Sequence, residues 1–488
     1  MPLLRGPYFR SNLGTLVRGV GQLPVMISSW RGRRRASPAW TVATALILAM
    51  VALPVVTIAL IGLKGGDGTW SHLASTVLPA SLRDTAILLV GVGTLTLIIG
   101  TGTAWLVTMY RFPGRGLLDR LLVIPLAMPT CLVAYCYVDL LDFDGPPQAL
   151  LRWLTGYTAR RDYWFPDVRS MTGAILMLSS VLYPYVYLTA RASFVQQSVC
   201  ALEVARTLGR TPLGAFWSVA LPLARPALAG GVALVLMECL NDIGAVQHLG
   251  IPTLAAAIQD TWQQRSSLAG AAQIAIVMLI LVAILFAIES AVRSGGSVVQ
   301  TTGRYRSLPF ADLEGWRAVG ATIACLLPFI AGFVLPALVL LANAWRHWSP
   351  LYDSAFWIAA MHSFFLAGLA AMAAVLLAVV ISYSRRVAAN GFTRPAARLA
   401  GLGYALPGTV LALGLLVALA TLDTAIHAFA KSTLGITTGL ILSGSVAALV
   451  VAYAIRFLAV SLSAIDSGLA RISPNLDAAA RTLGETAL

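Results

Sequence analysis

The chain has 488 residues and a formal net charge of +14; 58% of its residues are hydrophobic and only 11% are charged. A soluble globular domain carries about a quarter charged residues, so this composition excludes that class. Apolar runs of about 20 residues recur, each long enough to cross a bilayer, whereas a membrane barrel would need strands of about ten residues with alternating polarity. The predicted fold class is therefore an all-α polytopic membrane protein.

The N-terminal tail, residues 1–38, contains seven arginines and no acidic residue. It lacks the compact apolar segment of a cleaved signal peptide, so the first apolar run is expected to be a retained membrane anchor. Further arginines gather in alternate short loops, a pattern typical of cytoplasmic loops. The basic charge therefore indicates a cytoplasmic N-terminus and membrane topology, and it does not favour nucleic-acid binding.

Hydropathy and arginine placement together predict ten membrane spans. We expect them at residues 40–63, 84–110, 118–141, 171–194, 226–248, 268–292, 318–343, 356–383, 400–421 and 438–463.

The spans divide into two halves of similar design. A linker at 294–316, first Gly/Ser-rich and then charged, separates a first half (39–293) from a second half (317–488). Both halves are expected to begin on the same side of the membrane, so we predict a parallel duplication, unlike an inverted repeat. Short segments match between the halves: residues 127–130 with 405–408, and residues 173–176 with 439–442.

The pentapeptide Ala-Arg-Thr-Leu-Gly occurs at 205–209 and again at 480–484, each time in an arginine-containing loop after an apolar run. In the first copy Glu203 precedes it and the pair Leu221-Pro222 follows. Small residues let a partner's groove approach closely, and Gly209 can supply a turn with positive φ. Pro222 is expected to end the second short helix of the loop before the next span begins.

This arrangement resembles the cytoplasmic EAA loop of ABC importer permeases, which forms the coupling helix that docks on an ATPase. The resemblance implies a type I ABC importer transmembrane fold, duplicated in one chain. It assigns ATPase coupling to Glu203, Ala205, Arg206, Gly209, Leu221, Pro222, Ala480, Arg481 and Gly484.

The second copy of the loop begins near residue 477 and departs from the first. Ala478 stands where Glu203 stands in the first copy, with Asp477 one residue earlier. The Leu-Pro pair and the two spans that follow it in the first half have no counterpart before Leu488. The sequence therefore suggests a C-terminally truncated product with about 10 of an expected 12 spans.

Residues for nucleotide hydrolysis or other catalysis are not evident. The only lysines are Lys64 and Lys431, and neither lies in a G-x-x-x-x-G-K-[ST] motif. We therefore expect a transport subunit that is not an enzyme. It is expected to bind no cofactor, the sequence shows no metal site, and ATP is expected to bind to a separate subunit. The five cysteines are odd in number and lie in or beside apolar runs, which favours small buried hydrophobes over disulfides.

Glu238, Asn241 and Asp242 stand at i, i+3 and i+4 and are predicted to share one face of a helix. An acid deep in a membrane is costly unless it faces water or a partner. Two interpretations stay open: this face lines the translocation path and favours a cation, or the acid is structural and hydrogen-bonded to a neighbouring helix.

Most of residues 80–488 resembles the fused two-half ferric-iron permeases, through residues 181–188, 221–226, 236–245 and 405–410. The resemblance implies ferric iron (Fe3+) import in a bacterial inner membrane, with an ABC ATPase dimer and a periplasmic substrate-binding protein as partners. Thiamine, phosphonate and polyamine importers share this architecture and remain alternatives. An ion-coupled secondary transporter is the rival class; it would explain matched interruptions at Pro129 and Pro407 but gives the doubled polar loop no role.

Overall fold

The computed structural model describes residues 38–65, 68–196, 209–294, 311–387, 392–401, 403 and 406–470, with five positions between 472 and 483. In these residues the only sheet is a parallel pair of two-residue strands, β1 (Tyr110–Arg111) and β2 (Ala311–Asp312). Nine helices of the described residues are long and apolar enough to cross a membrane, or ten if one bent pair counts as a span. The predicted all-α polytopic membrane fold is confirmed.

The first half contains the following helices in chain order: α2 (Pro38–Lys64), α3 (Thr69–His72), η1 (Leu73–Val77), α4 (Leu78–Met109), α5 (Arg115–Leu121), η2 (Ile124–Ala127), α6 (Thr130–Leu141), α7 (Pro146–Thr155), η3 (Arg160–Asp162), α8 (Met171–Gln196), α10 (Pro212–Ala215), η4 (Phe216–Ala220), α11 (Leu221–Asn241), α12 (Gly244–His248), α13 (Leu254–Gln263) and α14 (Leu268–Ser294). The second half contains α15 (Gly315–Phe329), η5 (Ile330–Val334), α16 (Leu335–Arg346), η6 (Ser349–Tyr352), α17 (Ser354–Val387), α18 (Thr393–Ala400), α19 (Gly408–Leu434) and α20 (Val446–Leu469).

Helices α8 and α20 stand at corresponding positions of the predicted duplication. Met171 begins α8 and Val446 begins α20, and these starts are 275 residues apart, the same separation as the two copies of the pentapeptide. The expected match of 173–176 with 439–442 is therefore wrong, because Gly173 lies inside α8 whereas Gly439 lies in the loop before α20 with a φ of +67°.

Two prolines break the predicted spans at matching places. The span expected at 118–141 is bent by 95° between Arg115–Ala127 and Thr130–Thr155, and Pro129 is the residue before α6. Pro407 likewise directly precedes α19, so the span expected at 400–421 runs instead from Gly408 to Leu434. Proline lacks an N–H and disfavours helical geometry in the residue before it, which accounts for both breaks.

Three other prolines leave their helices continuous. Each follows a leucine that comes directly after a five-residue π-helical segment, in the pairs Leu78-Pro79, Leu221-Pro222 and Leu335-Pro336. The leucine N–H bonds the carbonyl five residues earlier, as from Leu221 to Phe216. A widened turn accommodates the proline ring and its missing donor, and this is a recognised cause of helix distortion.

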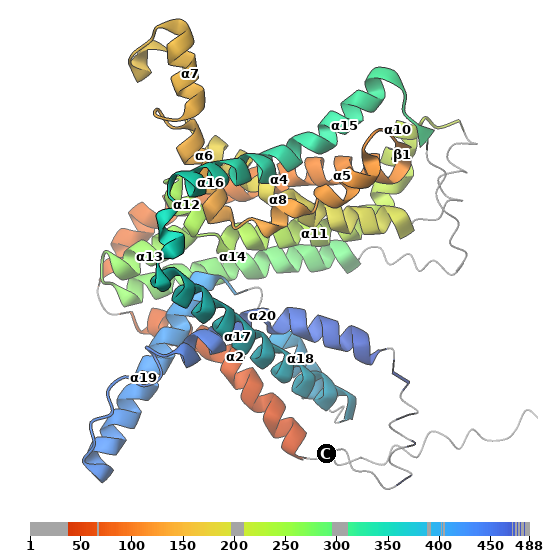
Figure 1. The fold of residues 1–488 in the computed structure, drawn as a ribbon. Coiled ribbons are helices and arrows are strands. Elements are labelled where there is room, and N and C mark those ends of the chain that lie inside the picture. The colour runs from red at the N-terminus through yellow and green to blue at the C-terminus, as the bar shows by residue number, and fades with distance from the viewer. Residues whose placement is uncertain are drawn as a thin grey trace, which may run out of the picture.

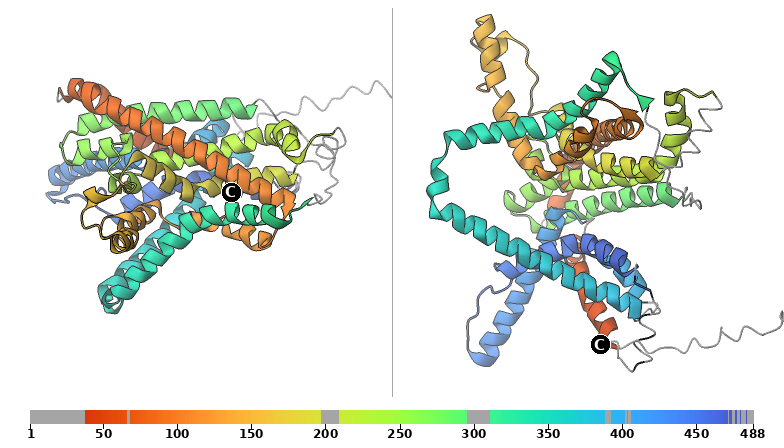
Figure 2. Two further views of the ribbon diagram at one scale, coloured as in Figure 1. Left: turned by 90° about the horizontal axis from the view of Figure 1, so that it is seen from above. Right: turned by 45° about the vertical axis from the view of Figure 1, so that its right-hand side comes forward.

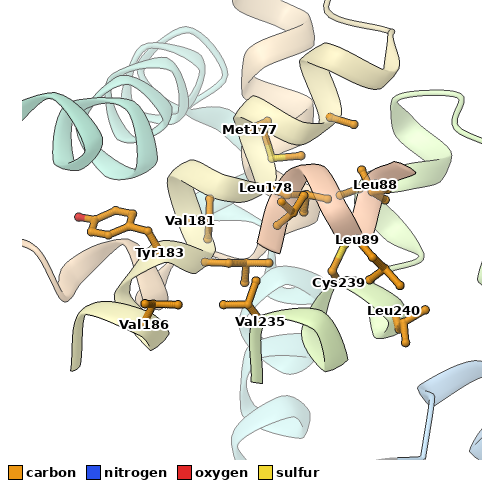
Figure 3. Packing of buried hydrophobic residues seen from close by; sticks show 14 of the residues in the cluster. Leu88, Leu89, Met177, Leu178, Val181, Tyr183, Val186, Val235, Cys239 and Leu240 are labelled. Atoms are coloured by element: carbon orange, nitrogen blue, oxygen red, sulfur yellow. The ribbon is translucent and has the colours of Figure 1, made fainter. Parts of the chain in front are cut away.

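The first half forms one large apolar core. Helix α4 packs most extensively against α8, and α11 packs against both. Figure 3 shows this contact: Leu88 and Leu89 of α4 face Leu178 of α8, with Val235 and Cys239 of α11 beside them. Helix α14 then covers α11, and the short helices α12 and α13 close one end of the bundle (Figure 1).

The first helix of each half reaches into the other half. Helix α2 lies with α17, α18 and α19 in Figure 1, and its Ile47 and Val51 belong to the second core, whereas its Ile58 belongs to the first core and its later turns pack on α14. Conversely, Ala321 and Cys325 of α15 belong to the first core. The arch from α15 through α16 to α17 carries the chain from one group of helices to the other (Figure 2).

Hydrogen bonds and a close glycine contact hold the helices that cross between the halves, here called the exchanged helices. Thr44 of α2 donates to Ser384 of α17 over 2.9 Å, and Tyr137 of α6 donates to the Ala331 carbonyl of η5 over 2.8 Å. A Cβ on Gly332 of η5 would overlap the Ser180 carbonyl of α8. Small residues at crossings let membrane helices approach closely, so the exchanged helices are fitted to their positions.

We predict that Gly332→Ala destabilises the protein by about 1–3 kcal/mol, because the added methyl group must push η5 and α8 apart. The measurement is the thermal unfolding midpoint in detergent micelles. Gly320→Ala is the matched control on the same helix, because nothing lies within 4 Å of a Cβ at Gly320. Equal midpoints for the two variants would contradict the close crossing.

Candidate functional site

The predicted docking loops lie mostly outside the described residues. This holds for Glu203, Ala205, Arg206, Ala480, Arg481 and Gly484. The structure resumes at Gly209, whose φ is +79° and whose Cβ position is free of neighbours. The predicted turn with positive φ is therefore confirmed, and it lies three residues before the start of α10.

The expected role of Pro222 as a helix stop is wrong. Residues Leu213–Asn241 form one continuous apolar helix, and Pro222 lies in the first turn of α11, after the π-helical segment η4. The π-turn compensates for the missing donor, so the proline does not end the helix. Leu221 and Pro222 thus join the docking loop to span α11 without an intervening break.

An aromatic cluster holds both ends of the first docking loop. Phe194 lies near the end of α8, before the loop, and Phe216 lies in η4, after it. The ring of Trp105, on α4, is 5.4 Å from Phe194 and 4.9 Å from Phe216 between centroids, within the range of favourable aromatic pairs. These contacts join α8 and η4, on the two sides of the loop, to α4. The sequence pattern did not identify Trp105 because it lies about 90 residues earlier in an apolar run.

The predicted common face of Glu238, Asn241 and Asp242 is wrong for Asp242. Helix α11 ends at Asn241, and Asp242 has extended backbone geometry with φ −81° and ψ 99°. All three residues are partly buried, and Glu238 lies three residues from the end of α11. Their proposed contact with a transported solute stays a prediction.

The side chains of Asn241 and Asp242 instead accept hydrogen bonds from backbone N–H groups at the starts of two helices. The Asn241 Oδ1 atom accepts a 3.0 Å hydrogen bond from the N–H of Gly408, the first residue of α19, and so connects the two halves. The Asp242 Oδ1 atom accepts from Ala245 over 2.9 Å in the first turn of α12. Polar side chains at these positions satisfy backbone donors that a helix start leaves unpaired. This arrangement favours the structural interpretation for these two residues.

Arg456 lies beside the same junction. It is the eleventh residue of the 24-residue helix α20, so it lies about 15 Å along an apolar span. A Cβ on Gly408 would stand 2.8 Å from its Nη1 atom. Within the described residues no carboxylate forms an ion pair with Arg456 and no acceptor bonds it. The sequence could have identified Arg456, because it is a lone arginine inside an apolar run. A charged residue inside a membrane span usually indicates a functional site.

The described residues contain no group of three or more His, Cys, Asp or Glu side chains that could hold a metal ion. Cys131, Cys136, Cys239 and Cys325 are free thiols, and Cys200 lies outside the described residues.

Residues 96–294 match the family model described as "Binding-protein-dependent transport system inner membrane component". The matched part runs from within α4 to the end of α14 and includes the first docking loop and the aromatic cluster. This part of the chain is therefore similar to the permease domain of binding-protein-dependent importers.

Three curated relatives show the range of similar proteins. The sulfate transport system permease protein CysT of Escherichia coli is 32% identical over 149 residues, covering 30% of this chain and 50% of the relative. The Fe(3+)-transport system permease protein FbpB 2 of Haemophilus influenzae is 25% identical over 343 residues, covering 68% and 62%. The molybdenum transport system permease protein ModB of E. coli is 28% identical over 195 residues, covering 38% and 80%. The chain thus spans about half the length of the sulfate relative.

We predict that Asn241→Ala lowers stability by about 1 kcal/mol, because the N–H of Gly408 loses its partner at the start of α19. Thermal unfolding in detergent is again the measurement. Asn343→Ala is the comparison, since Asn343 of α16 also bonds across the halves, to Asp139 at 3.0 Å, but in an exposed position. A smaller effect is expected there, and the reverse order would contradict the capping role of Asn241.

Proposed function

We propose that the chain is the membrane-spanning permease component of a binding-protein-dependent ABC importer, located in a bacterial inner membrane. The observation that carries this proposal is the family match over residues 96–294, which covers part of α4, the bent pair of helices between Arg115 and Thr155, the spans of α8, α11 and α14, and the loop that ends at Gly209. A separate ATPase dimer would dock on the cytoplasmic loops, and a substrate-binding protein would deliver solute to the opposite face.

The contacts around the first docking loop suggest how force would pass into the membrane. Phe194 and Phe216 bracket the loop, and both contact Trp105. Helix α10 continues through η4 into α11 without a break. When ATP binding draws the two ATPase subunits together, the loop therefore displaces α8 and α11 as one unit with α4, which turns the path outward; hydrolysis reverses the movement.

The cargo that we propose first is ferric iron. The match to the Fe(3+) permease extends over 68% of this chain and so reaches beyond one half, whereas the sulfate and molybdenum relatives cover 30% and 38% of it. The partly buried Glu238 would supply negative charge near the junction of α11 and α19. Iron is here the transported cargo and would not be a resident cofactor.

A second candidate cargo is a small oxyanion, and Arg456 is the observation that favours it. Its guanidinium lies deep in α20 beside the first residue of α19, and no described carboxylate neutralises it. Helix starts carry partial positive charge, so this environment favours anions over cations. The sulfate and molybdenum permeases among the relatives carry names consistent with this chemistry.

We predict that Gly209→Pro reduces transport-coupled ATP hydrolysis by at least about tenfold while membrane insertion stays normal, because proline fixes φ near −65° where the turn needs a positive value. The measurement is ATP hydrolysis by the ATPase recovered with the chain, in proteoliposomes. Gly156→Pro is the control, since Gly156 has a φ of +76° at the end of α7, away from the docking loop. Uptake that needs no ATPase at all would favour the secondary-transporter class.

We predict that Arg456→Gln separates the two cargo classes. Loss of the charge is expected to lower uptake of labelled sulfate or molybdate by at least about tenfold if the cargo is an anion, and to leave ferric-iron uptake unchanged or raised. Arg265→Gln is the matched control, because Arg265 is exposed beyond the end of α13. Anion uptake that Arg456→Gln leaves unchanged would exclude Arg456 as the anion-binding charge, and absence of anion uptake by the wild-type chain would exclude the oxyanion candidate.

A further inference from the structure

Each half of the chain carries an arginine–carboxylate ion pair on the helix that leads into its docking loop. In the first half the residue is Arg191 of α8, which lies fourteen positions before Ala205 of the pentapeptide. In the second half it is Asp466 of α20, which lies fourteen positions before Ala480. One member of each pair, Arg191 or Asp466, therefore occupies the same place relative to its docking motif.

The first pair joins α8 to the short helix α5. The Arg191 Nε atom donates to Asp119 Oδ1 over 2.6 Å, and its second nitrogen donates to Oδ2 over 2.8 Å. The fully buried Tyr187, one turn earlier on α8, also donates to Asp119 Oδ1 over 2.6 Å. A bidentate, charge-assisted pair is stronger and more directional than a neutral hydrogen bond, so α5 is fixed to the end of α8.

The second pair joins α20 to the end of α17. Arg385 lies 3.0 Å from Asp466 Oδ2. The neighbouring Arg386 donates to the carbonyls of Leu469, Ile472 and Ser473, the last at 3.3 Å. Arginine bound to the last carbonyls of a helix stabilises that end, so the end of α20 is held to α17.

The polarity of the pair is reversed between the halves. Arg191 and Asp466 are 275 residues apart, which is also the separation of the starts of α8 and α20, so they stand at equivalent positions with opposite charges. Both pairs are partly buried: the side chains are 39% and 24% exposed in the first pair and 39% and 31% in the second. The two halves therefore both place an ion-paired residue at this position, but its charge is reversed, and its partner lies on α5 in the first half and on α17 in the second.

The first pair also connects to the second half of the chain. The segment between α4 and α5 carries strand β1, which pairs with β2 just before α15. Thr322 of α15 donates to the carbonyl of Pro113 over 3.1 Å, and Leu313 donates to Arg111 over 2.9 Å. A displacement of α8 that moves α5 therefore also moves the start of the exchanged helix α15.

We propose that these two ion pairs are latches: Asp119–Arg191 and Arg385–Asp466 are positioning residues that make the base of each docking loop move as one body with its half of the membrane bundle. The inference rests on the proposed function, because it assigns the latches to the transmission of ATPase movement. Without a latch, the loop would follow the ATPase while α8 or α20 bends, and ATP would be hydrolysed with little transport.

The first latch can be tested by reversing and then restoring its charges. Arg191→Asp and Asp119→Arg are each expected to lower the ratio of solute transported to ATP hydrolysed by about tenfold, within the usual range of coupling between sites. The double variant, which has the polarity of the second half, is expected to return the ratio to within about twofold of wild type. Binding of the ATPase is measured alongside and is expected to stay unchanged.

A second measurement needs no partner. Spin labels at the exposed positions Leu117 of α5 and Val195 of α8, in a chain whose native cysteines are replaced, report the separation of the two helices in nanodiscs. A narrow distance distribution is expected for wild type and the double variant, and a broad one for each single reversal. This readout separates a loosened latch from an unfolded bundle.

The control is Arg160→Asp, which breaks an exposed 3.4 Å pair with Asp167 in the segment between α7 and α8 and is expected to change neither readout. Single reversals that keep both the wild-type ratio and the narrow distribution would overturn the proposal, as would a double variant no better than the singles. If the wild-type chain itself engages no ATPase, the proposed function fails, and the spin-label distances still decide whether the latch exists.

Discussion

Backbone hydrogen bonding in an apolar surrounding is the constraint on which this bundle depends. An unpaired N–H or C=O costs several kcal/mol in hydrocarbon, so every proline in a span requires a local solution. After the π-helical segments, the turn widens and the helix continues through Pro222. At Pro129 and Pro407 the chain breaks, and the next helix starts with donors that need acceptors. The positions of polar side chains near the junction of the halves follow from these breaks.

This constraint changes the meaning of the polar residues at the end of α11. Asn241 supplies the acceptor that the first residue of α19 needs, and Asp242 does the same for α12. A carboxylate deep in a membrane protein is therefore not by itself an indication of a cation path. Arg456 has no such structural partner in the described residues, so a positive charge without a structural explanation lies at this junction together with the partly buried Glu238. For this reason the oxyanion candidate stands beside iron.

The sequence predicted those features that depend on composition or on single residue types. Hydropathy located most of the spans but not the breaks at Pro129 and Pro407 or the end of α11 at Asn241, and glycine at position 209 correctly indicated a turn with positive φ. The exchange of α2 and α15 was not predictable, because hydropathy records burial in lipid or protein without naming the neighbour. The role of Pro222 was mistaken because proline ends helices in water, whereas here a π-turn accommodates it. Trp105 joined the docking site only through tertiary packing.

The exchanged helices and the latches have different roles in the proposed importer: the latches join elements within one half, and the exchanged helices join the two halves. Each latch joins elements of one half: Asp119 and Arg191 both belong to the first half, and Arg385 and Asp466 to the second. Because each pair is internal to its half, the polarity of one can reverse without affecting the other. Helices α2 and α15, in contrast, cross between the halves. Two bodies made rigid at their docking ends and joined by crossing helices can rotate against each other without separating, which is the movement that alternating access requires.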